Sequence, residues 1–375
     1  MRLALVTLAV LAVGTLVILA QTSGAPWQTD TRSKAGLRGP VRTCSEETIT
    51  GAPGASYSFV QTTEYSPEGR VMSQGTRTQD ASEWITTYDY DSAGHLLRST
   101  SGRADATPAD RTITNYTQDD SGMPIPLDST GRSSFVKFGR DDQGRRMKIV
   151  SMPEPPPGQN LGAVSAGSWE GGELPLGAPP NGSIITIYDK HGLPIEGESH
   201  DAEGHVVSRI VRSYDAKGRM TGDRLMPVNT TSAIPAELAA KLNPEQMKTM
   251  GAFIGAQFSK GQTAFKYDDD GRLIERRRSL PVFGNEITTI SYNEHGDVSL
   301  ERTAQRQSQD MGIEYGLADD GKMVPTTKPN VPPPTVSEMH YEYVYDSHGN
   351  WTSRKVYASG QTEPQSEQTR TLTYY

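Results

Sequence analysis

The sequence predicts an all-β fold in which antiparallel β-hairpin repeats form a continuous twisted or curved sheet, shell-like or solenoid-like, with a small helical insertion. A Tyr-Asp-x-x-Gly pattern recurs along the chain, and an apolar residue follows most of its glycines by two positions. Apolar and polar residues also alternate next to these turns, as at Tyr341, Tyr343 and Tyr345. Hydrophobic content is only 34%, which could indicate disorder, but the regular placement of Tyr and Gly favours a folded chain.

The recurring pattern has the chemistry of a tight hairpin turn. Asp or Asn at the first position of a type I turn accepts backbone hydrogen bonds, and Gly at the fourth adopts a left-handed conformation. This combination is typical of a hairpin loop with a glycine bulge. Weaker copies surround Gly122, Gly144, Gly204 and Gly321. The repeat-defining residues are Tyr65, Gly69, Tyr90, Asp91, Gly94, Tyr188, Asp189, Gly192, Tyr214, Asp215, Gly218, Tyr267, Asp268, Gly271, Tyr292, Asn293, Gly296, Tyr345, Asp346, Gly349 and Trp351.

This turn geometry also predicts which residues face each other. If Asp lies opposite the residue after Gly, the tyrosine before Asp lies opposite the second residue after Gly. Nearly every hairpin then pairs Tyr with an apolar partner, a cross-strand contact that stabilises sheets. The exception is the copy at Gly144, which pairs Arg140 with Arg146. The residues two positions after the glycines are Val71, Leu96, Val206, Met220, Leu273, Val298, Met323 and Trp351.

Two of the copies resemble the YD repeat of the RHS family. They are Phe265-Lys-Tyr-Asp-Asp-Asp-Gly-Arg-Leu-Ile274 and Tyr343-Val-Tyr-Asp-Ser-His-Gly-Asn-Trp351. The resemblance implies a short secreted bacterial member whose hairpins wind into a β-shell. In larger relatives such a shell encloses a C-terminal toxin or a ligand. We expect no toxin domain here, because residues 370–375 have the pattern of a strand.

The first residues indicate export. Residues 1–20 form a predicted signal peptide: Arg2 precedes an apolar run to Leu19, and Ala20 is a small residue suited to cleavage. An uncleaved N-terminal anchor is the alternative. With cleavage, we expect a secreted, periplasmic or cell-surface protein without further membrane insertion.

The mature chain divides into a flexible N-terminal segment, residues 21–38, and a repeat domain, residues 39–375. Residues 153–182 are rich in Pro and Gly and predict a long exposed loop, and residues 325–334 predict a shorter one. Residues 233–258 predict a helical insertion, in which Asn243 and Pro244 have the pattern of a helix start. We expect that insertion either to cover an open end of a sheet or to dock a partner.

Charge and cysteine content limit the partners. A formal net charge of −8 argues against nucleic acid and anionic membrane surfaces, which clustered Lys and Arg recognise. The single cysteine, Cys44, cannot form an internal disulfide and is expected to be a small apolar filler in the first strand. The oligomeric state is not predicted.

No catalytic motif is present, so we expect a protein that is not an enzyme and that uses no cofactor or metal. His200-Asp-Ala-Glu-Gly-His205 contains possible metal ligands, but these positions suit any polar residue at a hairpin end. The Asp268–Asp270 run lacks the spacing of a calcium loop. Gly316-Leu-Ala-Asp-Asp-Gly-Lys322 resembles a phosphate loop but continues with Met323 in place of Ser or Thr.

Three functional hypotheses follow from these features. The first is a secreted or envelope-associated scaffold that binds glycan or protein, with exposed tyrosine rows as possible sugar platforms. The second is a carbohydrate-active hydrolase whose acidic pair comes from separate hairpins. The third is a structural shell remaining from an RHS polymorphic-toxin system. For the tyrosines themselves, we favour packing against cross-strand partners over exposure to a sugar.

Overall fold

The structure, a computed structural model, confirms the predicted all-β class. Every strand pairing recorded among the described residues is antiparallel. The chain divides into two compact units, which are described separately. The described residues are 31–50, 57–78, 83–118, 124–127, 136–151, 167–169, 172–174, 181–226, 228, 240–258, 261–280, 284–306, 315–317, 323–325 and 333–375.

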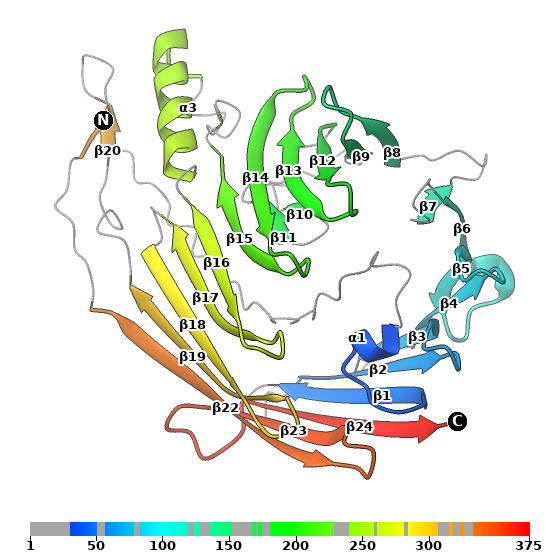
Figure 1. The fold of residues 1–375 in the computed structure, drawn as a ribbon. Helices are drawn as coiled ribbons and strands as arrows, with labels where there is room; N and C mark the ends of the chain where they lie inside the picture. The colour runs from blue at the N-terminus through cyan, green and yellow to red at the C-terminus, as the bar shows by residue number, and fades with distance from the viewer. Residues whose placement is uncertain are drawn as a thin grey trace. The chain divides into compact units, whose positions relative to one another are not determined.

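Unit 1 comprises Phe135–Thr288 and Thr303–Val336. Its strands follow one another in the sheet in chain order, apart from two small separate hairpins, β10–β11 and β20–β21 (Figure 1). Buried side chains such as Ile184, Tyr188 and Ile210 form its interior. The sheet strands are β8 (Val136–Arg140), β9 (Arg146–Ser151), β12 (Ser183–Tyr188), β13 (Pro194–His200), β14 (Val206–Tyr214), β15 (Met220–Leu225), β16 (Gln262–Tyr267), β17 (Leu273–Leu280) and the first part of β18 (Gly284–Tyr292). The small hairpins are β10 (Gly167–Trp169), β11 (Gly172–Leu174), β20 (Tyr315–Leu317) and β21 (Met323–Pro325).

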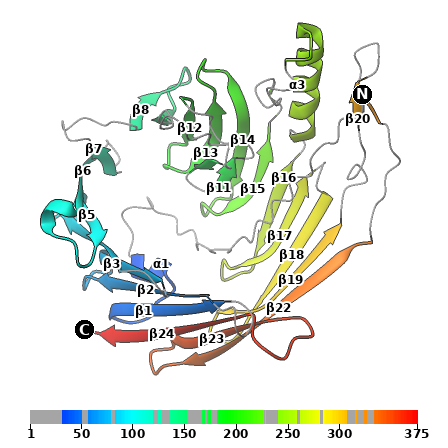
Figure 2. The same cartoon turned by 180° about the vertical axis from the view of Figure 1, so that it is seen from behind.

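Unit 2 comprises residues 31–134, Thr289–Arg302 and Ser337–Tyr375. Here the chain's first and last strands pair with each other, so that N-terminal and C-terminal hairpins share one ladder (Figure 2). In ladder order the strands are β19 (Val298–Arg306), β22 (Thr335–Tyr345), β23 (Trp351–Ala358), β24 (Ser366–Tyr374), β1 (Val41–Thr50), β2 (Tyr57–Tyr65), β3 (Val71–Thr78), β4 (Trp84–Tyr90), β5 (Leu96–Arg103), β6 (Thr112–Gln118) and β7 (Pro124–Leu127). A short helix α1 (Thr31–Lys34) precedes β1, and a 3-10 turn, Pro108–Asp110, follows β5.

The predicted turn chemistry is present in both units. In the turn after β14, the Asp215 carboxylate accepts hydrogen bonds from the backbone N–H groups of Lys217 and Arg219, both at 2.9 Å. Those contacts lower the pKa of Asp215, with the Arg219 backbone bond as the largest cause. Gly122 and Gly321 lie outside the described residues. The other predicted turn glycines all have φ between 75° and 89°: Gly69, Gly94, Gly144, Gly192, Gly204, Gly218, Gly271, Gly296 and Gly349.

The predicted cross-strand partners are also confirmed. In every recorded tyrosine hairpin, a one-residue bulge lies next to the pair in which tyrosine faces the second residue after glycine. The hairpin at Gly144 shows no such shift. The copy at Gly144 pairs Arg140 with Arg146, as expected, and Tyr188 has Pro194 as its partner. The remaining recorded tyrosine pairs are Tyr65–Val71, Tyr90–Leu96, Tyr214–Met220, Tyr267–Leu273 and Tyr345–Trp351.

In four recorded cases, a tyrosine also joins its hairpin to the one before it. The Tyr267 hydroxyl donates a 2.8 Å hydrogen bond to the Met220 carbonyl, two residues beyond the preceding turn glycine. This tyrosine clamp recurs with the same geometry in both units. Its other recorded examples are Tyr90 to Val71, Tyr214 to Pro194 and Tyr343 to Val298, each at 2.8 Å.

The N-terminal segment packs on unit 2 from Thr31 onward, which corrects the expectation of flexibility up to residue 38. Leu37 is 5% exposed and belongs to a core cluster with Val41, Cys44 and Tyr65. The Thr31 hydroxyl donates to the Gly69 carbonyl at 2.8 Å. Cys44 is a buried filler, as predicted, and burial raises the pKa of its thiol.

The helical insertion is described from residue 240 as α3 (Pro244–Phe258). The Asn243 side chain accepts from the Gln246 backbone N–H at 2.9 Å, and the Gln246 side chain accepts from the Asn243 N–H at 3.0 Å. This reciprocal cap places the helix start where the sequence predicts it. None of the described helices is long and apolar enough to span a membrane. The predicted signal peptide, residues 1–20, and most of the 325–334 loop lie outside the described residues, while the 153–182 segment contains β10 and β11.

We expect Tyr267→Phe to lower the free energy of unfolding by about 1 kcal/mol, because it removes one clamp hydrogen bond and keeps the ring. Tyr267→Ala should cost about 2–3 kcal/mol, because the ring packs as well. Urea unfolding measures both. Tyr57→Phe, at a side chain that is 51% exposed, is the matched control and should have little effect. If the Phe and Ala variants lose the same free energy of unfolding, the ring contributes nothing beyond the hydroxyl, and this assignment is wrong.

Candidate functional site

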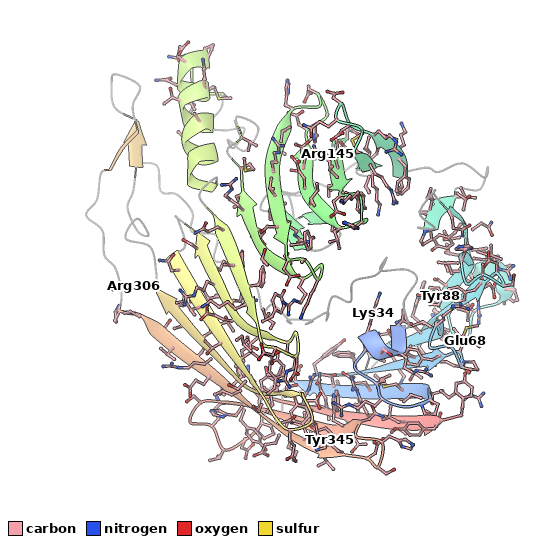
Figure 3. The ribbon with its side chains drawn as sticks, in the orientation of Figure 1. Lys34, Glu68, Tyr88, Arg145, Arg306 and Tyr345 are labelled. Carbon is pink, nitrogen blue, oxygen red and sulfur yellow. The ribbon has the colours of Figure 1, made fainter. Side chains whose placement is uncertain are left out.

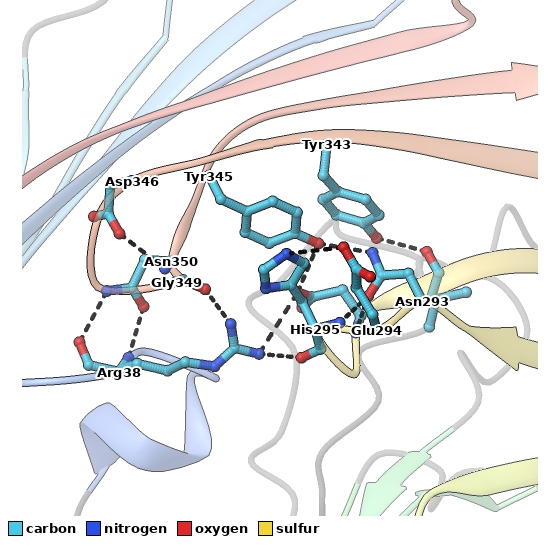
Figure 4. Close-up of polar contacts among 11 residues, drawn as sticks. Arg38, Asn293, Glu294, His295, Tyr343, Tyr345, Asp346, Gly349 and Asn350 are labelled. Carbon is cyan, nitrogen blue, oxygen red and sulfur yellow. Dashed lines mark hydrogen bonds and ion pairs between the residues drawn. The ribbon is translucent and has the colours of Figure 1, made fainter.

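An open hollow in unit 2 brings aromatic and polar side chains from two hairpins together. It has a volume of about 490 Å³ and is open to solvent. It lies where the β18–β19 turn meets β22 (Figure 4). Its lining is Asn293, Glu294, His295, Ser299, Tyr341, Tyr343 and Tyr345.

Strand alternation places the three tyrosines on one face of β22. Side chains two residues apart point to the same side of a strand, and Tyr341, Tyr343 and Tyr345 are each half-buried. Val344, between two of them, is 59% exposed on the opposite face. We call these three residues the tyrosine platform.

Neighbouring rings hold the platform in place. The Tyr343 and Tyr345 rings stack with centroids 5.8 Å apart and 26° between their planes. The His295 ring stacks on Tyr345 at 3.9 Å, and Trp351 meets Tyr343 edge-on at 6.4 Å. The platform is therefore a row of fixed aromatic surfaces rather than a set of loose side chains.

The phenol hydroxyls are committed to hydrogen bonds within the protein. Tyr343 donates to the Val298 carbonyl at 2.8 Å, and Tyr345 donates to the Asp297 carboxylate at 3.0 Å. Tyr341 makes a longer contact, 3.4 Å, with the Glu301 carboxylate. A ligand would therefore meet the rings rather than their hydroxyls.

Burial raises the pKa of each platform tyrosine to about 12. The nearby Glu301 carboxylate adds to the increase at Tyr341, and Asp297 adds to it at Tyr343 and Tyr345. The phenols are therefore neutral at physiological pH and are poor candidates for general bases or nucleophiles.

Arg38 holds the two turns beside the hollow. Its guanidinium donates to the carbonyls of Gly349 and His295 and lies 3.7 Å from the Asp297 carboxylate. Its backbone N–H donates to the Asn350 side-chain oxygen at 2.6 Å, and Asn350 donates back to the Arg38 carbonyl at 2.8 Å. The N-terminal segment thus fixes the turn that carries His295 (Figure 4).

The lining does not present the paired carboxylates of a glycosidase. Glu294 is the one carboxylate among the lining residues, and its side chain is 89% exposed. The nearby Asp297 already accepts from Tyr345 and faces Arg38. An acid that protonates a leaving group is usually held in an apolar setting, whereas the Glu294 side chain is largely exposed to solvent.

The predicted His200–His205 region resolves into two separate arrangements in unit 1. Asp201, Glu203 and His205 have ligand atoms within 4.8 Å of one another. The Asp201 carboxylate, however, accepts from the backbone N–H groups of Glu203 and His205, as turn carboxylates do throughout the chain. His200 instead contacts the Glu198 carboxylate at 2.9 Å. We assign no metal to this turn.

Most of the repeat-defining residues shape turns, and only a few of them reach the hollow. Asn293 and Tyr345 line it, and Trp351 is buried beside it. Sequence patterning identified the tyrosine alternation but missed His295 and Ser299 as lining residues. The sequence could have indicated them only by their place in a repeat, because His295 lies within a repeat turn and Ser299 lies in the strand that follows it.

Comparisons with known proteins give no assignment. No family model and no curated protein matches the chain. Solved structures that align with it include a porin-like protein from Bacteroides uniformis, 10% identical over 90% of this chain and 98% of that one, with a TM-score of 0.29. A Photorhabdus luminescens Tc holotoxin pore aligns at 12% identity over 88% of this chain and 18% of that one, with a TM-score of 0.19. At such low TM-scores, neither likeness supports a functional argument.

We expect the platform tyrosines to ionise late in an alkaline titration followed by phenolate absorbance. Subtracting the titration of Tyr343→Phe from that of the unmodified protein should isolate a group with a midpoint near pH 12, instead of the usual value of about 10. Because the folded pKa is raised, the associated stabilisation is fully present below about pH 10 and is lost as pH rises through 12. A difference midpoint near 10 would contradict the burial of this ring.

Proposed function

We propose that this chain is a non-catalytic scaffold, exported to the cell envelope or beyond, that binds glycan through the tyrosine platform. The observation that carries the proposal is the row of three fixed, half-buried rings lining an open hollow. The signal-peptide pattern supports an extracytoplasmic location, and the turn pattern supports membership of the YD-repeat class of the RHS family.

The chemistry of the hollow favours a sugar. Pyranose rings present an apolar face of C–H groups that suits the face of an aromatic ring, while their rims carry hydroxyls. Around the platform, His295 and Ser299 provide polar groups of the kind that orient a ligand in a largely aromatic site. The Asn293 side chain is already bonded to the Tyr345 hydroxyl and to the turn backbone. No lysine or arginine belongs to the lining, so an anionic ligand would lack a counter-charge there.

The experiment begins with a broad glycan array probed with the mature protein, residues 21–375. Affinities for retained glycans are then measured for three variants. Tyr343→Ala should weaken binding at least about tenfold, equivalent to about 1.4 kcal/mol. Tyr343→Phe should bind nearly as the unmodified protein does, because the hydroxyl is occupied by the Val298 carbonyl.

Val344→Ala is the matched control, since this neighbour is 59% exposed on the other face of β22. Its affinity should be unchanged. Circular dichroism establishes that each variant is folded. The proposal is wrong if the folded protein retains no glycan, or if Tyr343→Ala and Val344→Ala bind equally. Retention of an envelope protein instead of a glycan would favour the scaffold as a protein-binding module.

A further inference from the structure

The face that carries the tyrosine platform continues across unit 2. Residues directly opposite in antiparallel strands share a face of the sheet. The register pairs Tyr343 of β22 with Arg354, and Arg354 with Gln368. It then pairs Gln368 with Thr48, and Thr48 with Phe59 of β2. One row of side chains therefore leads from the platform to β2.

Hydrogen bonds between the side chains agree with this register. Arg354 donates to the Gln368 side-chain oxygen, and Gln368 donates to the Thr48 hydroxyl at 3.3 Å. In the next row, Arg370 donates to the Glu46 carboxylate at 2.9 Å. We call these five residues the polar strip.

A second aromatic group lies at the far end of the strip. Tyr57 and Phe59 are two residues apart on β2, and their ring centroids are 6.4 Å apart. Phe59 lies opposite Thr78, and Trp84 of β4 lies opposite Thr76, so all three rings share the face of the strip. Tyr57 and Trp84 are each 51% exposed. We call Tyr57, Phe59 and Trp84 the rim aromatics.

The separation of the two aromatic groups suits a chain rather than a single sugar. Four strand-to-strand steps separate β22 from β2 through β23, β24 and β1. At about 4.8 Å a step, this is roughly 19 Å, longer than one pyranose ring. Figure 3 marks the two ends of this stretch of unit 2, with Tyr345 on β22 and Tyr88 on β4, the strand that also carries Trp84.

Both cations of the strip are already engaged within the protein. Arg370 is paired with Glu46, and its guanidinium lies 3.5 Å from the centroid of the Trp351 ring. Arg354 bonds to Gln368 and stacks on the same indole at 4.9 Å. An anionic polymer would have to compete with these contacts for the two guanidinium groups.

We propose that unit 2 binds a single extended, uncharged polysaccharide chain that runs across the strands from the tyrosine platform to the rim aromatics. The inference rests on the proposed function and names its ligand class. The platform and the rim aromatics stack on separate sugar units. Between them, the half-buried Arg354 and Gln368 contact sugar hydroxyls, while the buried Thr48 supports Gln368 through a hydrogen bond.

The test measures affinity as a function of chain length. Its probes are neutral glucan, mannan and xylan oligomers, from disaccharide to octasaccharide, with uronate oligomers of equal length for comparison. Affinity for the recognised neutral series should rise with length. Trp84→Ala should remove about tenfold of affinity from the long oligomers and leave the short ones unchanged, whereas Tyr343→Ala should weaken every length.

Ile113→Ala is the matched control, because Ile113 is 55% exposed and lies opposite Thr100, on the other face of the sheet. Compared with Trp84→Ala, Trp84→Phe should regain much of the affinity for long oligomers, because it keeps an aromatic ring at this position. If short oligomers bind and Trp84→Ala matches the unmodified protein at every length, the extended site is wrong while the platform stands. Tighter binding of uronates would overturn the neutral ligand class. If the folded protein binds no oligomer, both proposals fail.

Discussion

The structure depends on one local constraint, the turn in which an Asp or Asn side chain caps the backbone and glycine adopts a left-handed conformation. The Asp215 carboxylate accepts two backbone N–H groups, and Gly218 has a φ of 75°. Together they fix a bulge of one residue, and in a strand a shift of one residue moves every side chain to the opposite face. The turn therefore decides which face each tyrosine occupies.

The tyrosine clamp connects neighbouring hairpins of this local geometry to one another. Each recorded clamp hydroxyl reaches the carbonyl two residues beyond the previous turn glycine, as in Tyr267 to Met220. The ring also packs against the apolar partner in its own hairpin. One side chain thus supplies both packing and a directional bond between repeats, which suits a chain with only 34% hydrophobic residues.

The same logic explains what the sequence could predict. Turn positions, the Tyr–apolar pairs and the start of α3 depend on residues close together in the chain, so their patterns are visible. Arg38 meets Gly349 and Asn350 across more than 300 residues, and no local pattern encodes that contact. The pairing of β1 with β24 and the placement of His295 over Tyr345 are long-range in the same sense, which left the hollow beyond prediction.

The β22 hairpin has more tyrosine than the clamp requires. Tyr343 makes the bond to the Val298 carbonyl, while Tyr345 and Tyr341 direct their hydroxyls to the Asp297 and Glu301 carboxylates. The β4 hairpin has two such rings, Tyr88 and Tyr90, and both bond to the preceding hairpin, whereas β22 has a third. Because all three hydroxyls are engaged, the platform has ring surface to offer a ligand. Such a surface recognises shape and C–H faces, and the specificity for hydroxyls must come from its polar neighbours.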